Sequence, residues 1–135
     1  MATWKMVTGG AGFIGSNFVR HRLRTSSDSI LVVDKLTYAG HRVSLADVLD
    51  DPRVELVVAD IADGETMDAL VRDYRPEAIL NFAAESHVDR SIDGPGNFLR
   101  SNTVGVFELL ESVRRYLPDL PPGHREDFRF LQVST

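Results

Sequence analysis

The chain has 135 residues, of which 43% are hydrophobic and 26% are charged, and its net charge is −5 at pH 7. These values are typical of one globular domain with a sizeable core, and the acidic balance argues against a nucleic-acid partner. There is no cysteine, which excludes disulfides and thiolate chemistry, and no apolar run of the ~18 residues that a membrane-spanning helix needs. We expect a cytoplasmic protein with neither a membrane nor a nucleic acid as partner.

The most informative stretch is TGGAGFIG at positions 8–15, where Gly9, Gly12 and Gly15 recur every third residue. It follows a short segment, 3–7, that we expect to be a buried strand, and it precedes a stretch with helical spacing. Glycines in this pattern let the chain turn sharply and let the backbone approach a dinucleotide pyrophosphate. The first N–H groups of the following helix would then face the phosphates.

A carboxylate closes the next expected strand. Residues 30–34 (ILVVD) form a continuous apolar run that ends in Asp34, 19 residues after Gly15. In a dinucleotide-binding fold, an acid at this place accepts hydrogen bonds from the adenosine ribose and repels a 2′-phosphate. The pattern therefore favours NAD over NADP. The alternative is an aspartate that only caps a turn.

The remaining segments alternate between strands and helices. The apolar patterns predict strands at 54–60, 78–84 and 128–133, and helical segments at 43–49, 67–74 and 97–116. In the last helix the expected buried stripe comprises Val106, Leu109, Leu110, Val113 and Leu117. Proline and glycine indicate a turn at 94–96 and a loop at 118–127.

This alternation predicts an α/β fold, a doubly wound parallel sheet of the Rossmann type in which residues 1–135 form one domain. We expect five strands in the order 3-2-1-4-5, with the switch point between the first and fourth strands. The glycine run and residues 83–86 would face each other across that crevice. Asp60, at the carboxyl end of the third strand, would meet the adenine.

Several motifs occur together along the chain: TGGAGFIGS at 8–16, DKLTYAG at 34–40, AD-I at 59–61, AAESHVDRSI at 83–92, Asn102 and the closing VST. In this order and spacing they resemble the extended short-chain dehydrogenase/reductase superfamily, and within it the dTDP-glucose 4,6-dehydratases. The glycine motif is shared by the whole superfamily, whereas DKLTYAG followed by AAESHVDRSI is far more specific. The resemblance covers essentially the whole chain.

The resemblance implies NAD as a tightly held, recycling oxidant and dTDP-glucose or a related nucleotide sugar as substrate. In such enzymes the 4-hydroxyl of the sugar is oxidised, water is eliminated across C5 and C6, and the hydride returns to C6. A ketone at C4 acidifies the adjacent C–H, so that a modest general base can remove it. The family commonly dimerises through a four-helix bundle, which implies a homodimer to which the 97–117 helix contributes.

The resemblance also assigns site residues by position. Besides the glycines, the cofactor positions are Phe13 and Ile14 at the pyrophosphate, Asp34, Lys35, Leu36 and Thr37 around the ribose, Asp60 and Ile61 at the adenine, and Phe82, Ala83, Ala84, Glu85, Ser86 and Ser101 along the cofactor. Ser86 would also reach the sugar. Thr135 would be catalytic, because it matches the threonine that hydrogen-bonds the reacting 4-hydroxyl.

The chain departs from the family pattern in one respect. The Asp-Glu pair that follows this threonine and the later Tyr-x-x-x-Lys couple are not among the 135 residues, since none of Tyr38, Tyr74 and Tyr116 has a lysine four positions on. We therefore expect this chain to be the N-terminal, NAD-binding portion of such an enzyme. The remainder of the sheet and the sugar-nucleotide domain would lie outside it.

Other functions are also considered. A UDP-sugar epimerase or decarboxylase of the same superfamily, or a non-catalytic NAD-binding module, would share the glycine run. A hydrolase built on Ser86 and His87 is disfavoured, because adjacent residues on one loop rarely point at each other. No His/Asp spacing suggests a metal site.

Overall fold

A parallel five-stranded sheet forms the centre of the computed structural model, which describes residues 3–36, 42–83 and 95–133. Its strands are β1 (Trp4–Thr8), β2 (Ser29–Asp34), β3 (Val54–Val58), β4 (Ala78–Asn81) and β5 (Arg129–Gln132). Their spatial order is β3-β2-β1-β4-β5. The predicted fold class and strand order are therefore confirmed, and β1 and β4 are neighbours at the switch point.

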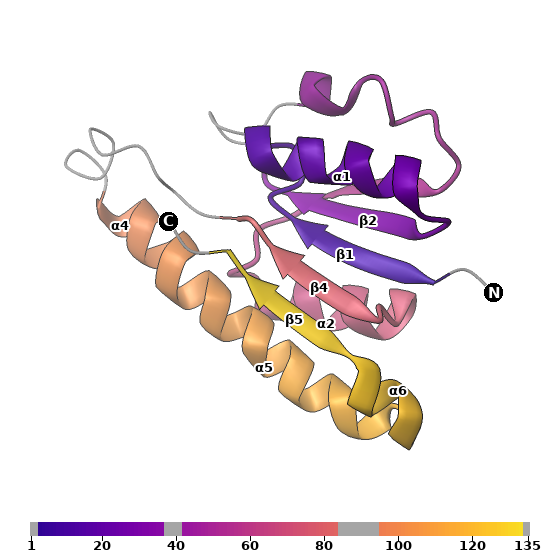
Figure 1. Cartoon of the computed structure of the whole chain (residues 1–135). Coiled ribbons are helices and arrows are strands. Elements are labelled where there is room, and N and C mark those ends of the chain that lie inside the picture. Colours follow the sequence, from indigo (N-terminus) through magenta and orange to yellow (C-terminus); the bar gives the residue numbers. More distant parts are fainter. Residues whose placement is uncertain (1–2, 37–41, 84–94, 134–135) are drawn as a thin grey trace.

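Helices cover both faces of the sheet (Figure 1). One face carries α1 (Phe13–Thr25) and the 3₁₀ turn η1 (Arg42–Leu45), and the other carries α2 (Gly64–Tyr74) and α5 (Val106–Tyr116). Helix α4 (Pro95–Leu99) and the π-helical segment η2 (Arg100–Gly105) precede α5. The 3₁₀ turn η3 (Leu117–Asp119) and α6 (Pro122–Asp127) lead into β5. Among the described ranges, no helix is long and apolar enough to cross a membrane.

Two hydrophobic clusters lie on the two faces of the sheet because successive side chains of a strand point to opposite sides. Met6 and Leu31 pack with Val71 and Leu109 on the α2–α5 side. Their strand neighbours, among them Val7, pack on the α1 side. Strands buried on both faces need apolar residues at every position, which explains the continuous apolar run of β2.

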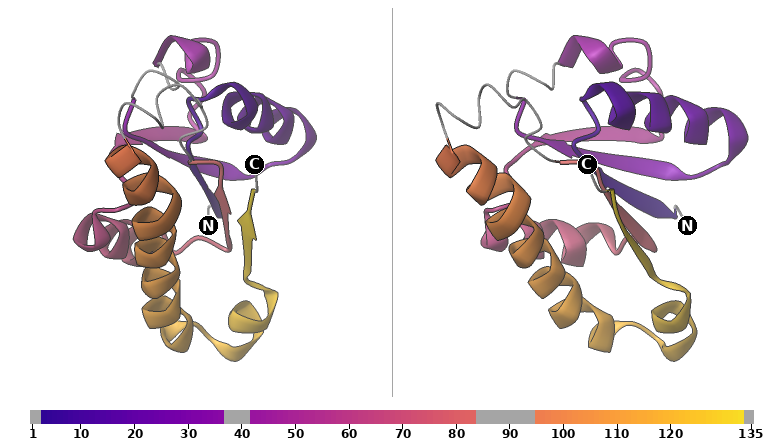
Figure 2. Two further views of the ribbon diagram at one scale, coloured as in Figure 1. Left: turned by 90° about the vertical axis from the view of Figure 1, so that its left-hand side faces the viewer. Right: turned by 60° about the vertical axis from the view of Figure 1, so that its left-hand side comes forward.

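The segment from α4 through η2 to α5 forms one long helical rod beside the sheet (Figure 2). Two sequence predictions here are wrong. The rod begins at Pro95, which the sequence analysis assigned to a turn, and Leu110 of the expected buried stripe is 45% exposed. Tyr116, outside that stripe, is buried and donates a hydrogen bond to the Pro76 carbonyl at 3.0 Å.

The predicted loop at 118–127 is also wrong, since η3 and α6 occupy most of it. Pro122 stands in the first turn of α6. Proline is favourable there, because the first N–H groups of a helix have no intrahelical partner and the proline φ already suits a helix. The same reason explains Pro95 at the start of α4.

Candidate functional site

The glycine turn lies at the carboxyl end of β1, where the strand order reverses between β1 and β4. Gly9 has φ +69°, in the left-handed region that favours glycine. A Cβ on Gly9 would also stand 2.6 Å from the nitrogen of Ala83 and from the carbonyl carbon of Phe82. The turn after β1 and the chain after β4 therefore touch through backbone, and only glycine permits this approach.

The turn leads directly into α1. The Gly12 N–H donates to the Gly9 carbonyl at 3.1 Å, and Gly12 is the N-cap residue, with no side-chain hydrogen bond capping the helix. A Cβ on Gly15 would collide with the Gly9 carbonyl oxygen and stand 2.9 Å from the Cα of Gly10. The uncapped start of a helix against a glycine turn offers N–H groups and a positive dipole end to an anion.

Phe13 and Ile14, the two residues predicted at the pyrophosphate, open α1. Their side chains are 84% and 62% exposed, the largest and fourth-largest exposures among the large hydrophobic residues of the described ranges. Both therefore stand open at the same helix start as the uncapped N–H groups. This combination suits a ligand that carries charge on one part and flat apolar surface on another.

Asp34, the predicted ribose acid, is buried at the end of β2. One carboxylate oxygen accepts the Ala11 N–H at 2.9 Å, and the other accepts the Leu36 N–H at 2.8 Å. Leu36 has φ +56°, so Asp34 also closes a tight turn. Asp34 therefore caps the turn that follows β2 and also binds the glycine turn after β1. A role in capping a turn is thus compatible with a role in binding the ribose.

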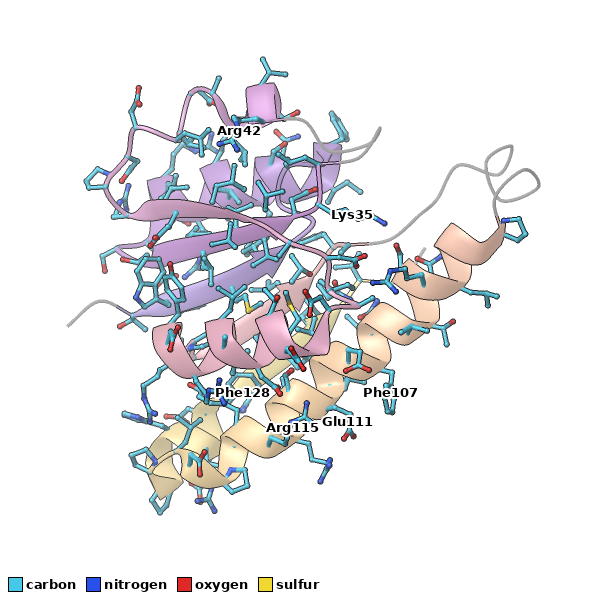
Figure 3. All side chains as sticks on the ribbon, turned by 180° about the vertical axis from the view of Figure 1, so that it is seen from behind. Lys35, Arg42, Phe107, Glu111, Arg115 and Phe128 are labelled. Carbon is cyan, nitrogen blue, oxygen red and sulfur yellow. The ribbon has the colours of Figure 1, made fainter. Side chains whose placement is uncertain are left out.

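Lys35 and Ser101 contact each other, although the sequence analysis assigned both to the cofactor. The Lys35 ammonium donates to the Ser101 hydroxyl at 3.2 Å, across 66 positions of chain. Ser101 lies in η2 and is buried. Figure 3 shows the Lys35 side chain leaving the carboxyl end of β2 on the side of the helical rod.

Asp60 follows the carboxyl end of β3 and is held on both oxygens. It accepts the Ala62 N–H at 2.9 Å and the Arg100 Nε at 3.0 Å. Burial by itself would raise the pKa of Asp60, but the hydrogen bonds from Ala62 and Arg100 and the charges of Lys35 and Arg100 outweigh it and lower the pKa below its usual value. Asp60 therefore presents a stable negative charge at the predicted adenine end.

Ile61, the second predicted adenine residue, is buried against η2. A Cβ on Gly105 would stand 2.5 Å from its Cγ1 atom. The close packing of Ile61 on Gly105 therefore fixes the distance between the end of β3 and the π-helical segment. π-Helical segments are rare and are frequent at functional sites.

Asn81 is a site residue that the sequence analysis missed. It is fully buried at the end of β4, where its Oδ1 accepts from the Thr8 hydroxyl and from the Ala83 N–H, the latter at 3.2 Å. Its Nδ2 donates to Gln132 of β5 at 2.8 Å. One amide thus joins the carboxyl ends of three strands. The sequence did offer one indication of this role, because Asn81 is a polar residue at the end of an apolar strand.

The structure brings most of the predicted cofactor residues to one edge of the sheet. Phe82 and Ala83 follow β4 beside Gly9. The predictions for Thr37, Ala84, Glu85, Ser86 and Thr135 fall outside the described residues.

A parallel doubly wound sheet with a glycine turn at its switch point and a carboxylate at the end of its second strand has the Rossmann fold of dinucleotide-binding proteins. Comparison with known proteins defines the chain further. Residues 6–135 match the model of the family described as GDP-mannose 4,6 dehydratase. The chain belongs to this family.

The most similar proteins include sugar-nucleotide dehydratases. The chain is 50% identical over 130 residues to dTDP-glucose 4,6-dehydratase of Neisseria gonorrhoeae, which covers 96% of the chain and 38% of that protein. Among solved structures, the dTDP-glucose 4,6-dehydratase of Bacillus anthracis in complex with NAD superposes with a TM-score of 0.80 at 34% identity, over 99% of the chain and 38% of that structure.

Epimerases share the same fold. The UDP-glucose 4-epimerase of Thermotoga maritima with UDP-glucose has a TM-score of 0.75 at 31% identity, over 84% of the chain and 35% of that structure. The chain therefore spans less than two fifths of the length of each of these proteins.

Proposed function

We propose that these 135 residues are the NAD-binding portion of a dTDP-glucose 4,6-dehydratase, which converts dTDP-glucose to dTDP-4-keto-6-deoxyglucose. The observation that carries the proposal is the 50% identity to the Neisseria gonorrhoeae dehydratase, which extends over 96% of the chain. The glycine turn, Asp34 and Asp60 all lie within the family match at 6–135. The remaining part of the sheet and the sugar-nucleotide domain would be supplied by further chain.

The described residues fit NAD. Gly9 and Gly15 let the backbone of the turn pack closely where a Cβ would collide, and α1 begins at this tight turn without a side-chain cap. Asp34 would accept the ribose hydroxyls and exclude a 2′-phosphate, while Asp60 and Ile61 would receive the adenine. NAD, when bound, would accept the hydride from C4 of the sugar and return it to C6.

Two further roles rest on the family resemblance. Ser86 and Thr135 would contact the sugar, with the Thr135 hydroxyl on the reacting 4-hydroxyl. Oxidation at C4 makes the C5 proton acidic, which allows a general base to assist loss of water across C5 and C6. A cytoplasmic location is part of the proposal and is compatible with a chain that has no cysteine.

A homodimer is also proposed, with the outer face of the helical rod as the interface. Leu99 and Phe107 are 63% and 58% exposed there, and Leu110 is exposed beside them. Figure 3 shows Phe107 and Glu111 projecting from α5 away from the sheet. Exposed apolar residues gathered on one helix face are typical of a protein interface. Phe107→Arg is expected to convert a dimer to a monomer in light scattering, whereas Arg24→Ala, on α1 at the opposite face of the sheet, should not.

The proposal is tested with the protein expressed from its complete gene. Incubation with dTDP-glucose should yield a 4-keto product, measured by its alkali-induced absorbance. Turnover of a UDP-sugar without any signal from dTDP-glucose would favour the epimerase or decarboxylase alternative, for which the Thermotoga maritima likeness is the supporting observation. NAD⁺ binding without turnover of either sugar would favour a non-catalytic module.

A further inference from the structure

Lys35 is the cation nearest in sequence to the proposed ribose acid, and its backbone is fixed on both sides. Asp34, directly before it, binds the N–H groups of Ala11 and Leu36. Leu36, directly after it, has φ +56°. With the turn held in this way, the Lys35 side chain leaves β2 in a defined direction, and its ammonium reaches the Ser101 hydroxyl at 3.2 Å.

Ser101 is a firm anchor for this ammonium. It is only 4% exposed and belongs to η2, whose last residue, Gly105, packs directly on Ile61. The first residue of η2, Arg100, is bound to the Asp60 carboxylate at 3.0 Å. The segment that carries Ser101 is thus attached to the end of β3 at both of its ends.

The electrostatics favour the same position. The charge of Lys35 lowers the pKa of Asp60, so the ammonium is close enough to that carboxylate to interact with it. The Ser101 hydroxyl therefore holds the ammonium near the ends of β2 and β3, within range of the Asp60 charge. Without such an anchor, a lysine beside Asp34 could neutralise its charge or pair with a phosphate on the ribose, because ammonium groups bind phosphate as flexible point charges.

We propose that Ser101 is a selectivity-determining residue: by holding the Lys35 ammonium in η2, it leaves the charge of Asp34 uncompensated at the ribose and so disfavours a 2′-phosphorylated dinucleotide. This inference rests on the proposed NAD site and deepens it. Selectivity then depends on two residues, the acid that repels the phosphate and the serine that keeps the neighbouring cation from attracting it.

The test compares the dissociation constants of NAD⁺ and NADP⁺ by isothermal titration calorimetry on the protein expressed from its complete gene and on its variants. Ser101→Ala should lower the ratio of the NADP⁺ to the NAD⁺ constant about fivefold, the scale of one partly exposed charge contact. Ser101→Thr keeps the hydroxyl and should keep the original ratio. Ser112→Ala removes a buried serine between α2 and α5 and should also leave the ratio unchanged.

The double variant Ser101→Ala/Lys35→Met identifies the cause. Because the released ammonium is then absent, the ratio should return to that of the parent chain. An unchanged ratio in Ser101→Ala, or a lowered ratio that persists in the double variant, would overturn the inference while leaving the NAD site intact. A parent chain that binds no NAD⁺ would overturn the proposed site and the inference with it. Circular dichroism melts confirm that each variant is folded.

Discussion

The two ends of the sheet are both polar, but they are built in different ways. At the carboxyl ends, Asp34 and Asn81 bind backbone N–H groups of the turns beside them. At the amino ends, charged side chains bind each other: Lys5 pairs with Glu77 and with Asp28, the latter at 3.3 Å. Arg22 of α1 also pairs with Asp28.

Because the two ends are built differently, we expect residues at the carboxyl ends to affect ligand binding and residues at the amino ends to affect only stability. Hydrogen bonds from side chains to backbone fix where the turns lie, and those turns stand at the edge of the sheet where the dinucleotide is proposed to bind. Ion pairs between side chains hold the α1–β2 connection to β1 and to the start of β4. Variants at the carboxyl end should therefore change both NAD⁺ affinity and the free energy of unfolding, whereas variants at the amino end should change only the latter.

The largest effect is expected from Gly15→Ala. The new methyl group would collide with backbone atoms of Gly9 and Gly10, which cannot move aside as a side chain can. We expect a loss of roughly 3 kcal/mol in the free energy of unfolding and a fall of more than about 100-fold in NAD⁺ affinity, measured by urea melts and calorimetry. Gly123→Ala in α6 is the matched control, because a methyl group there meets nothing within 4 Å. Retained NAD⁺ affinity in Gly15→Ala would show that the turn does not form the site.

Asn81→Leu is expected to have the next largest effect. The variant leaves Thr8 and the Ala83 N–H without their buried partner, at a cost of about 2–3 kcal/mol. Thr8→Val alone should cost less, and the double variant should cost less than the sum, because both changes break one network. Urea melts of the four proteins measure the coupling. Strict additivity would mean that Asn81 does not join β1 to β4.

Asp34→Asn keeps the shape of the side chain but removes its charge and one of its two acceptor oxygens. One of the N–H groups of Ala11 and Leu36 then loses its acceptor, which should cost about 1–2 kcal/mol. NAD⁺ affinity should fall about tenfold, since charge-assisted hydrogen bonds to the ribose are lost. Asp47→Asn, which alters an exposed partner of Arg20, is the control. Equal losses in the two variants would contradict a special role for Asp34.

At the amino end, Asp28→Asn should cost about 1 kcal/mol at pH 7 and leave NAD⁺ affinity unchanged. Burial by itself would raise the pKa of Asp28, but hydrogen bonds from Arg22 and Lys5 outweigh it and lower the pKa. The stabilisation is therefore complete above the unfolded pKa of about 3.9 and is lost as pH falls through the lower folded value. Urea melts between pH 7 and 2 should show the parent and the variant converging in acid. A tenfold change in NAD⁺ affinity would show that the two ends are not independent.

Patterns of apolar residues along the sequence predicted the strands and the order in which they pair. Apolar runs and crossover helices were enough for the five strands and their order. Prolines were misread, since Pro95 and Pro122 start helices instead of ending structure. Leu110 was predicted to be buried but is exposed. Helical spacing shows which residues share one face of a helix, but it does not show which residues at the border of that face a neighbouring element covers.

The sequence by itself determined the chemistry available at the carboxyl edge of the sheet: glycines where backbone must approach backbone, and the acids Asp34 and Asp60 at the ends of strands. Only the tertiary structure decided their partners. Asp34 meets Ala11 across 23 positions and Lys35 meets Ser101 across 66. Parallel strands separated by crossover helices bring such distant residues to one edge, and which of the nearby groups then bind each other depends on distances of a few tenths of an ångström that no spacing in the sequence encodes.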